Sequence, residues 1–89
     1  MEKIWTDLAW EQYTDLITEN NKQMIKKIND LLKDIERNGL SNGKGNPEPL
    51  KGNLSSYYSR QINEKDRLVY KFVDNKLLIT QCKGHYDDK

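Results

Sequence analysis

One stretch decides the fold, and its sequence is Arg67-Leu68-Val69-Tyr70-Lys71-Phe72-Val73-Asp74-Asn75-Lys76-Leu77-Leu78-Ile79-Thr80-Gln81-Cys82. β-Branched and aromatic residues are frequent in both halves of this stretch, as they are in strands, and the middle, Asp74-Asn75-Lys76, has the composition of a tight turn. The pattern therefore predicts a β-hairpin whose strands cover residues 67–73 and 77–85 and whose loop has three residues.

The apolar residues of this hairpin predict its register. Pairing Val73 with Leu77 gives the even-numbered positions a largely apolar face that helices can cover. The other pairs are then Phe72 with Leu78, Tyr70 with Thr80, and Leu68 with Cys82. The odd-numbered face carries Arg67, Val69, Lys71, Gln81, Lys83 and His85. In this register Arg67 and His85 lie diagonally on one polar face, within reach of one shared ligand, whereas a slip of one residue would separate them.

The chain before the hairpin predicts one short strand and two helices. Ile4-Trp5 forms the strand, and a modest helical stripe follows at Leu8, Tyr13, Leu16 and Ile17. A strongly amphipathic helix comes next, with apolar residues at spacings of three and four, which are Met24, Ile25, Ile28, Leu31, Leu32 and Ile35. Gly39 is a natural end for this helix. Only Asn20-Asn21 separates the two helices, so we expect them to run antiparallel.

The remaining segments complete the predicted architecture. Residues 38–53 have no periodicity and predict a long loop, which in a compact domain is usually functional or disordered. Residues 54–62 predict a further strand. Together the elements predict one α+β domain over residues 1–89, with two antiparallel helices packed on a twisted, mainly antiparallel four-stranded sheet. The other face of that sheet is left for a functional site.

Composition excludes several classes of protein. The 15 Lys and Arg residues nearly balance the 14 Asp and Glu residues, so bulk charge alone predicts no nucleic-acid binder. The single cysteine, Cys82, excludes an internal disulfide framework and alternates into the apolar face, where we expect a buried, inert thiol. One His and one Cys suggest no metal site and no cofactor. No apolar run approaches the roughly 18 residues of a membrane span or forms a signal peptide, so we expect a cytoplasmic protein.

The near-neutral total hides a split along the chain. Residues 1–43 carry six basic and eight acidic groups, a net charge of −2. Residues 44–89 carry nine basic and six acidic groups, a net charge of +3. The loop-and-sheet half is therefore the basic half, which favours it as the side that meets an anionic partner.

Four residues stand out as a candidate catalytic group. Glu48 lies between Pro47 and Pro49, which restrict the backbone and present the carboxylate from a stiffened loop. With Arg67, His85 and Tyr86 it supplies a base, a cation and an acid. Each also has an ordinary interpretation: Glu48 as a solvated loop carboxylate, Arg67 as one partner of a cross-strand ion pair, and His85-Tyr86 as a strand terminus.

Several motifs together resemble a known family. They are Gly43-Lys44-Gly45-Asn46-Pro47-Glu48-Pro49-Leu50-Lys51, Asn53-Leu54-Ser55, Tyr58-Ser59-Arg60, Arg67-Leu68-Val69-Tyr70 and His85-Tyr86, with Ile4-Trp5 and Lys26-Lys27-Ile28-Asn29 nearer the N-terminus. This set resembles the YoeB (Txe/YoeB) toxins of the RelE superfamily of toxin–antitoxin modules over essentially the whole chain. The resemblance implies a RelE-like fold with a microbial-ribonuclease-like core.

The resemblance also implies an activity, a ribosome-dependent endoribonuclease that cuts messenger RNA without a metal and so inhibits translation. In the family's pattern Glu48 is the general base, His85 the general acid, Arg67 the transition-state cation and Tyr86 the terminal active-site tyrosine. Attack by the RNA 2′-hydroxyl would leave a 2′,3′-cyclic phosphate or 3′-phosphate and a 5′-hydroxyl. Four further basic residues are candidates for RNA-phosphate contacts: Lys44, Lys51, Arg60 and Lys83.

The implied partners are messenger RNA, the ribosomal A site with its 16S and 23S RNA, and a cognate YefM/Axe-like antitoxin. A homodimer is also implied, and operator DNA is bound only together with the antitoxin. Two alternatives remain. One is a non-enzymatic inhibitor like the ParE toxins, which share the fold, and the other is an inactive module that only binds antitoxin or regulates its operon. The set Glu48, Arg67, His85 and Tyr86 favours the nuclease.

Overall fold

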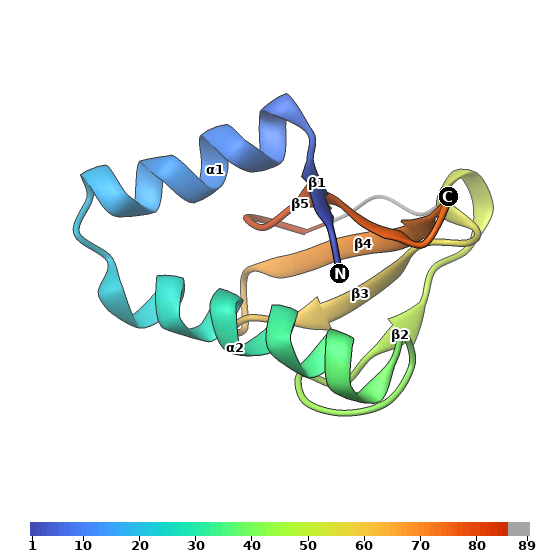
Figure 1. Cartoon of the computed structure of the whole chain (residues 1–89). Helices are drawn as coiled ribbons and strands as arrows, with labels where there is room; N and C mark the ends of the chain where they lie inside the picture. Colours follow the sequence, from blue (N-terminus) through green and yellow to red (C-terminus); the bar gives the residue numbers. More distant parts are fainter. Residues whose placement is uncertain (86–89) are drawn as a thin grey trace.

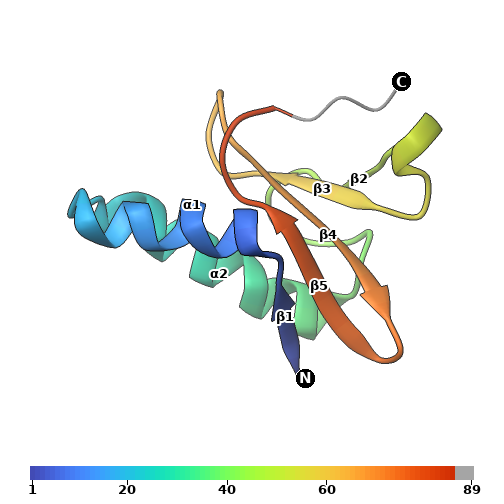
Figure 2. The same cartoon turned by 90° about the horizontal axis from the view of Figure 1, so that it is seen from above.

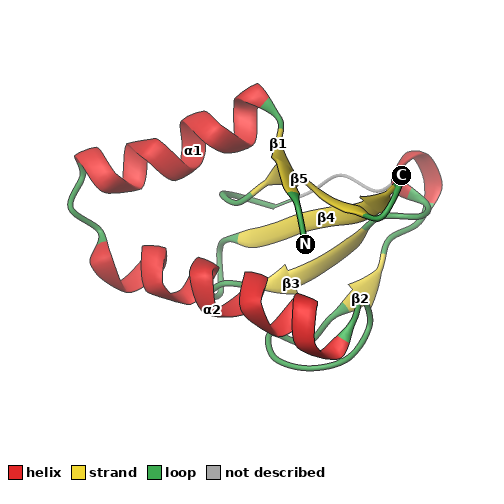
Figure 3. Cartoon of the chain, in the orientation of Figure 1, coloured by secondary structure: helices red, strands yellow, loops and turns green. Residues whose placement is uncertain are grey.

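The computed structural model describes residues 1–85 and contains two helices and one five-stranded sheet (Figures 1 and 3). The elements in chain order are β1 Lys3–Trp5, α1 Asp7–Thr18, α2 Lys22–Asn38, β2 Glu48–Pro49, a 3₁₀ helix at Gly52–Leu54, β3 Tyr58–Gln61, β4 Arg67–Val73 and β5 Lys76–Gln81. The strand order is β1-β5-β4-β3-β2, with β1 parallel to β5 and the other pairs antiparallel. The predicted α+β fold is confirmed, with one strand more than expected.

The two helices begin at side-chain caps. The Thr6 hydroxyl accepts a hydrogen bond from the Ala9 N–H at 3.2 Å, and the Asn21 amide oxygen accepts one from the Met24 N–H at 3.2 Å. At the end of α2 the N–H of Gly39 donates to the Ile35 carbonyl, and its φ of +87° suits glycine. The helices run in opposite directions, as Figure 1 shows and as the short link predicts.

Both helices and one face of the sheet share a single hydrophobic core. Its helical members are Ala9 and Leu16 on α1, and Met24, Ile28, Leu31, Leu32 and Ile35 on α2. The sheet and its flanking segments contribute Ile62, Leu68, Tyr70, Leu77, Ile79 and Cys82. Figure 2 shows both helices on the same side of the molecule, with the strands extending away from them. The expected burial of Cys82 is confirmed, because its side chain is fully enclosed.

The hairpin register differs from the predicted one close to the turn. Its loop has two residues, Asp74 and Asn75, and Val73 pairs with Lys76. Both loop residues have positive φ, +51° and +66°, which is the geometry of a tight turn that matches strand twist. The predicted length of three residues for this loop was therefore wrong by one residue.

A β-bulge then restores the predicted pairing further along. The register shifts between Val69 and Tyr70, so that Tyr70 pairs with Ile79 and Val69 with Gln81, leaving Thr80 as the extra residue. Near the turn the buried β5 positions are consequently Leu77 and Ile79 rather than the even-numbered ones. Beyond the bulge Leu68 and Cys82 are both buried, as the sequence predicts.

Candidate functional site

The sheet face turned away from the helices carries one row of residues across four strands. Glu48 on β2 pairs with Ser59 on β3, Ser59 pairs with Val69 on β4, and Val69 pairs with Gln81 on β5. Directly paired residues point to the same face, and the hydrophobic core contains Leu68 and Tyr70 on either side of Val69 but not Val69 itself. The register thus places the exposed Glu48 on this face, although the sequence predicts a loop at this position. We call the face that is turned away from the helices the open face; Ser59 and Val69 within it are buried, whereas Glu48 at its edge is exposed.

The sequence pattern missed this strand because β2 has only two residues. Pro49 has no N–H to donate, so proline in a strand is confined to an edge, and β2 is an edge strand. The Leu50 N–H donates to the Tyr57 carbonyl at 3.0 Å and extends the pairing by one residue. Ser59 and Gln81 were also not recognised as the residues that link Glu48 to the rest of the face.

Arg67 lies on the same face as Glu48. It is two residues before Val69 and pairs with Gln61. Its Nη1 donates to the carbonyls of Asn63, Glu64 and Asp66 at 2.8, 3.3 and 3.2 Å, so the turn between β3 and β4 anchors one edge of the guanidinium. Strands are spaced about 4.8 Å apart, so β2 and β4 lie about 10 Å apart across the open face.

The backbone of His85 is docked beside the start of β4. The Arg67 N–H donates to the Gly84 carbonyl at 3.0 Å, and the Gly84 N–H donates to the Asp66 carboxylate at 2.7 Å. The Gln81 amide donates to the carbonyls of Gly84 and His85 at 2.9 and 2.8 Å. Residue 85 is thereby tied to the strand that carries Arg67, and its side chain is exposed. Tyr86, the fourth predicted catalytic residue, lies outside the described residues.

The four predicted RNA-phosphate contacts divide into two groups. Lys44, Lys51 and Lys83 are exposed. Arg60 is fully buried, and its guanidinium is paired with Asp34 on α2. A buried guanidinium whose donors are used inside the chain corrects the expectation that Arg60 contacts RNA.

The Arg60–Asp34 pair also has an electrostatic signature. Hydrogen bonds from the Lys44 backbone N–H and from Arg60 hold the pKa of the Asp34 carboxyl below its ordinary value. The carboxylate is therefore ionised where it meets the buried guanidinium, as a buried ion pair requires.

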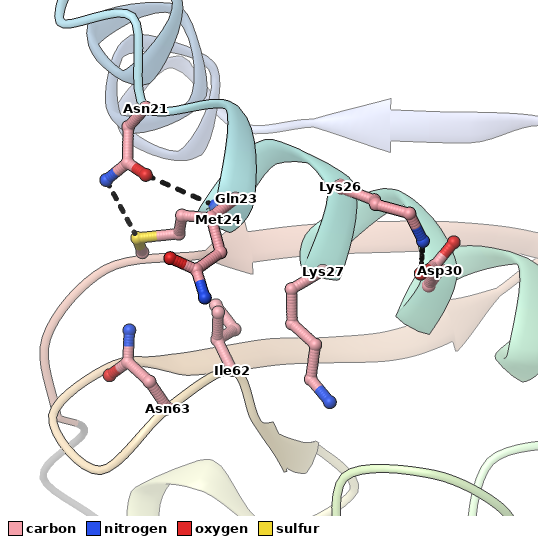
Figure 4. A pocket seen from close by; sticks show the side chains of 8 residues that line it. All are labelled: Asn21, Gln23, Met24, Lys26, Lys27, Asp30, Ile62 and Asn63. Carbon is pink, nitrogen blue, oxygen red and sulfur yellow. Dashed lines mark hydrogen bonds and ion pairs between the residues drawn. The ribbon is translucent and has the colours of Figure 1, made fainter.

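A groove of about 520 Å³ lies elsewhere, on the helical side of the molecule (Figure 4). Its lining comes from the first half of α2 and the segment after β3, namely Asn21, Gln23, Met24, Lys26, Lys27, Asp30, Ile62 and Asn63. Figure 4 shows the ion pair between Lys26 and Asp30 at one side of it. Of the predicted catalytic residues that the structure describes, Glu48, Arg67 and His85 do not line this groove, so the candidate site lies on the other face of the sheet.

Two further tests concern metals and membranes. Within residues 1–85, no group of three or more His, Cys, Asp or Glu side chains is placed to hold a metal ion. Neither of the two described helices has the length and apolar character needed to cross a membrane.

Comparison with known proteins identifies the family. The family model described as the YoeB-like toxin of bacterial type II toxin–antitoxin systems matches residues 5–86. Toxin YoeB of Escherichia coli is 48% identical over 86 residues, which cover 97% of this chain and 100% of that protein. Toxin YoeB of Streptomyces coelicolor is 44% identical over the same length.

Solved structures agree with the sequence comparison. The YoeB–YefM complex from Staphylococcus aureus contains a chain that is 50% identical, with a TM-score of 0.88 and coverage of 97% of this chain and 98% of that chain. The YoeB dimer from the same organism is 49% identical with the same TM-score and coverage. Family model, sequence relatives and structures thus agree over nearly the whole length, and the chain belongs to the YoeB-like toxins of bacterial type II toxin–antitoxin systems.

Proposed function

We propose that this toxin is a ribosome-dependent endoribonuclease that cuts messenger RNA in the A site and so stops translation. The observation that carries the proposal is the register of the sheet. It sets Glu48 and Arg67 on one open face, two strands apart, with the backbone of His85 tied beside Arg67. An acid–base pair flanking a cation is the arrangement that cleavage of RNA by its own 2′-hydroxyl needs.

The chemistry assigns each group one task. Glu48 accepts the proton of the 2′-hydroxyl, because a positioned carboxylate can act as the general base for the attacking hydroxyl. Arg67 stabilises the negative charge that builds on the phosphorane, since its planar fork fits phosphate oxygens. His85 donates a proton to the departing 5′-oxygen, and Tyr86 stacks on a base or binds phosphate. The products are a 2′,3′-cyclic phosphate, or 3′-phosphate, and a 5′-hydroxyl.

The exposed lysines and the partners complete the proposal. Lys44, Lys51 and Lys83 contact RNA phosphates, and the ribosome supplies most of the positioning because the net charge is only +1. By analogy with the Staphylococcus aureus proteins, we propose that a YefM-like antitoxin neutralises this chain and that two copies form a dimer. Toxin and antitoxin together would bind operator DNA, and the site of action is the cytoplasm.

A cleavage assay on translating ribosomes tests the function. The purified chain is added to ribosomes carrying a defined message, and Glu48→Gln and His85→Gln are compared with Glu11→Gln, which changes an exposed carboxylate on α1. We expect Glu48→Gln and His85→Gln each to slow cutting by about 10²–10⁴-fold and Glu11→Gln to leave it unchanged. Uncut message with the wild type, or equal cutting by all variants, would contradict the proposed function.

A further inference from the structure

The feature that the proposed chemistry leaves unused is the buried guanidinium of Arg60. Its side chain is fully enclosed, and all five of its N–H groups have acceptors. Nε donates to the Tyr70 hydroxyl at 2.9 Å, and Nη1 donates to Asp34 and to the Lys44 carbonyl at 3.0 Å. Nη2 donates to the carbonyls of Gly39 and Asn42 at 2.8 and 2.7 Å. One side chain therefore binds three carbonyls of the loop that follows α2.

Other hydrogen bonds close this loop around the guanidinium. The Tyr70 hydroxyl donates to the Leu40 carbonyl at 2.7 Å, and the Lys44 N–H donates to the Asp34 carboxylate at 2.8 Å. The Gln61 N–H donates to the Gly45 carbonyl at 2.6 Å. Segment 39–45 is thus built on polar contacts from α2, β3 and β4, and we call it the clamp loop.

Two glycines let the clamp loop approach this closely. A Cβ at Gly43 would lie 1.9 Å from the Asp34 Oδ2, and a Cβ at Gly45 would lie 2.9 Å from the Leu31 Cδ2. Both glycines also have positive φ, +113° and +81°. The spacing Gly43-Lys44-Gly45 is therefore explained by packing against Arg60, Asp34 and their neighbours.

The clamp loop leads directly to Glu48. Only Asn46 and Pro47 separate its last residue from β2, and Glu48 pairs with Ser59, the residue next to Arg60. Since β2 has only two residues, its own ladder supplies few hydrogen bonds to hold the backbone of Glu48. The clamp loop holds this strand from one side, and the hydrogen bond between Leu50 and Tyr57 holds it from the other.

We propose that Arg60, together with Asp34, is a positioning residue that sets Glu48 on the open face of the sheet. This inference rests on the proposed function, because it gives Arg60 a task only if Glu48 is the general base. A displacement of about 1 Å in a reacting group lowers the rate by about 10²-fold. Loosening the clamp loop should therefore lower kcat while leaving KM, which reports RNA and ribosome binding, nearly unchanged.

Arg60→Lys is the informative variant. Lysine keeps the positive charge beside Asp34 but has three donors on one atom instead of five in a planar fork, so it cannot bind Asp34, Tyr70 and the loop carbonyls together. We expect about a 10²-fold loss of kcat in the ribosome assay. The double variant Arg60→Lys/Glu48→Gln should be no slower than Glu48→Gln alone, because positioning a carboxylate has no effect once it is absent.

A second pair of variants opens the clamp loop without touching any charge. Gly43→Ala forces a clash with Asp34, whereas Gly39→Ala meets nothing within 4 Å and has a similar positive φ. Both variants carry backbone strain, and only the first displaces the clamp loop from Asp34. We expect Gly43→Ala to lower kcat at unchanged KM. Gly39→Ala strains the same loop without a steric clash, so we expect it to lower kcat much less, at a temperature where circular dichroism shows each variant folded.

The results separate this inference from the function on which it rests. A wild type that cuts, a Glu48→Gln that does not, and full activity of Arg60→Lys and Gly43→Ala would overturn the positioning role alone. An additive loss in the double variant would also overturn it, because it would give Arg60 an effect independent of Glu48. If Arg60→Lys does not fold, the comparison of Gly43→Ala with Gly39→Ala tests the positioning role instead, and equal kcat values for these two variants would overturn it. A wild type that leaves the message uncut overturns both.

Discussion

The two ends of the sheet are held in place by different kinds of contact. At the β1–β5 end, the strands are covered by helices through apolar side chains such as Ile79 and Leu16, which are almost fully buried. At the β2–β3 end, the clamp loop is held by the hydrogen bonds and the charge of one buried arginine, Arg60. Apolar packing is spread over many contacts, whereas the polar end depends on a small set of hydrogen bonds centred on one buried arginine, so the two ends should respond very differently to substitution.

The largest expected effect comes from removing the charge at the polar end. Arg60→Met leaves Asp34 buried without its partner and the loop carbonyls without donors, which should lower the free energy of unfolding by about 3–5 kcal/mol. Ile79→Val at the apolar end should cost about 0.5–1.5 kcal/mol. Urea denaturation followed by circular dichroism measures both, and equal losses would contradict the contrast between the ends.

A substitution in the hairpin turn at the apolar end changes backbone strain rather than side-chain packing. Asn75 has a φ of +66°, where a β-branched residue is strained. We expect Asn75→Val to lower the free energy of unfolding by about 1–2 kcal/mol and Asn75→Gly to preserve it. Ribosome cleavage by the folded Asn75→Val variant should stay at the wild-type level, because the turn is remote from Glu48. A loss of activity at full folding would refute the separation of the two ends.

Acid pH should weaken the polar end in particular. The pKa of the Asp34 carboxyl is lowered in the folded state, so its contribution to stability is present above the ordinary carboxyl pKa of about 4 and is lost as pH falls through the lower folded value. The slope of the urea midpoint against pH below about pH 4 should be shallower in Asp34→Asn. The pKa values of Asp30 and Glu36 are lowered by Lys26 and Lys3, so some slope remains. An unchanged slope in Asp34→Asn would show that the Asp34 carboxyl does not contribute to the loss of stability at acid pH.

The smallest expected effect concerns the thiol of the apolar end. Burial raises the pKa of the Cys82 thiol to about 11, and the side chain is fully enclosed. The folded protein should react slowly with a disulfide reagent at pH 8, and urea should release the thiol. The folded pKa lies above the unfolded value of about 8.5, so ionisation of this thiol favours the unfolded chain. Its effect on the free energy of unfolding is therefore absent below about pH 8.5, and the stability decreases as the pH rises from there toward 11. Immediate reaction of the folded chain would show that the apolar end opens readily.

The contrast between the apolar and polar ends also explains how much of the fold the sequence predicts. Alternation of apolar residues predicts the helices, the hairpin and its covered face because burial acts on every second or every third to fourth residue. The two-residue turn at Asp74 and Asn75 and the bulge at Thr80 each shift that alternation by one position, and neither leaves an apolar signal. The errors cancel beyond the bulge, which is why Val69 still lies opposite Gln81 and on the same face as Arg67.

The candidate site is predicted less completely than the core. Family motifs indicate Glu48, Arg67 and His85, but the strand that carries Glu48 is too short to show a period. Arg60 was misassigned because its partner Asp34 is 26 residues away and contact across that distance depends on the folded loop. The two glycines at 43 and 45, near a buried arginine, were the only local sign of the close approach.

The parallel pairing of β1 with β5 constrains the order in which the strands of the sheet can pair. Lys3 lies beside Leu77, so the first strand must wait for a partner from the opposite end of the chain, and closing such a long loop is slow compared with forming the hairpin. The helices and the β3–β5 meander can assemble from neighbouring segments, so we expect the first strand to dock last. During synthesis, a growing chain that lacks β5 has no strand with which β1 can pair. A toxin with this strand order therefore cannot complete its sheet until residues 76–81 have been synthesised.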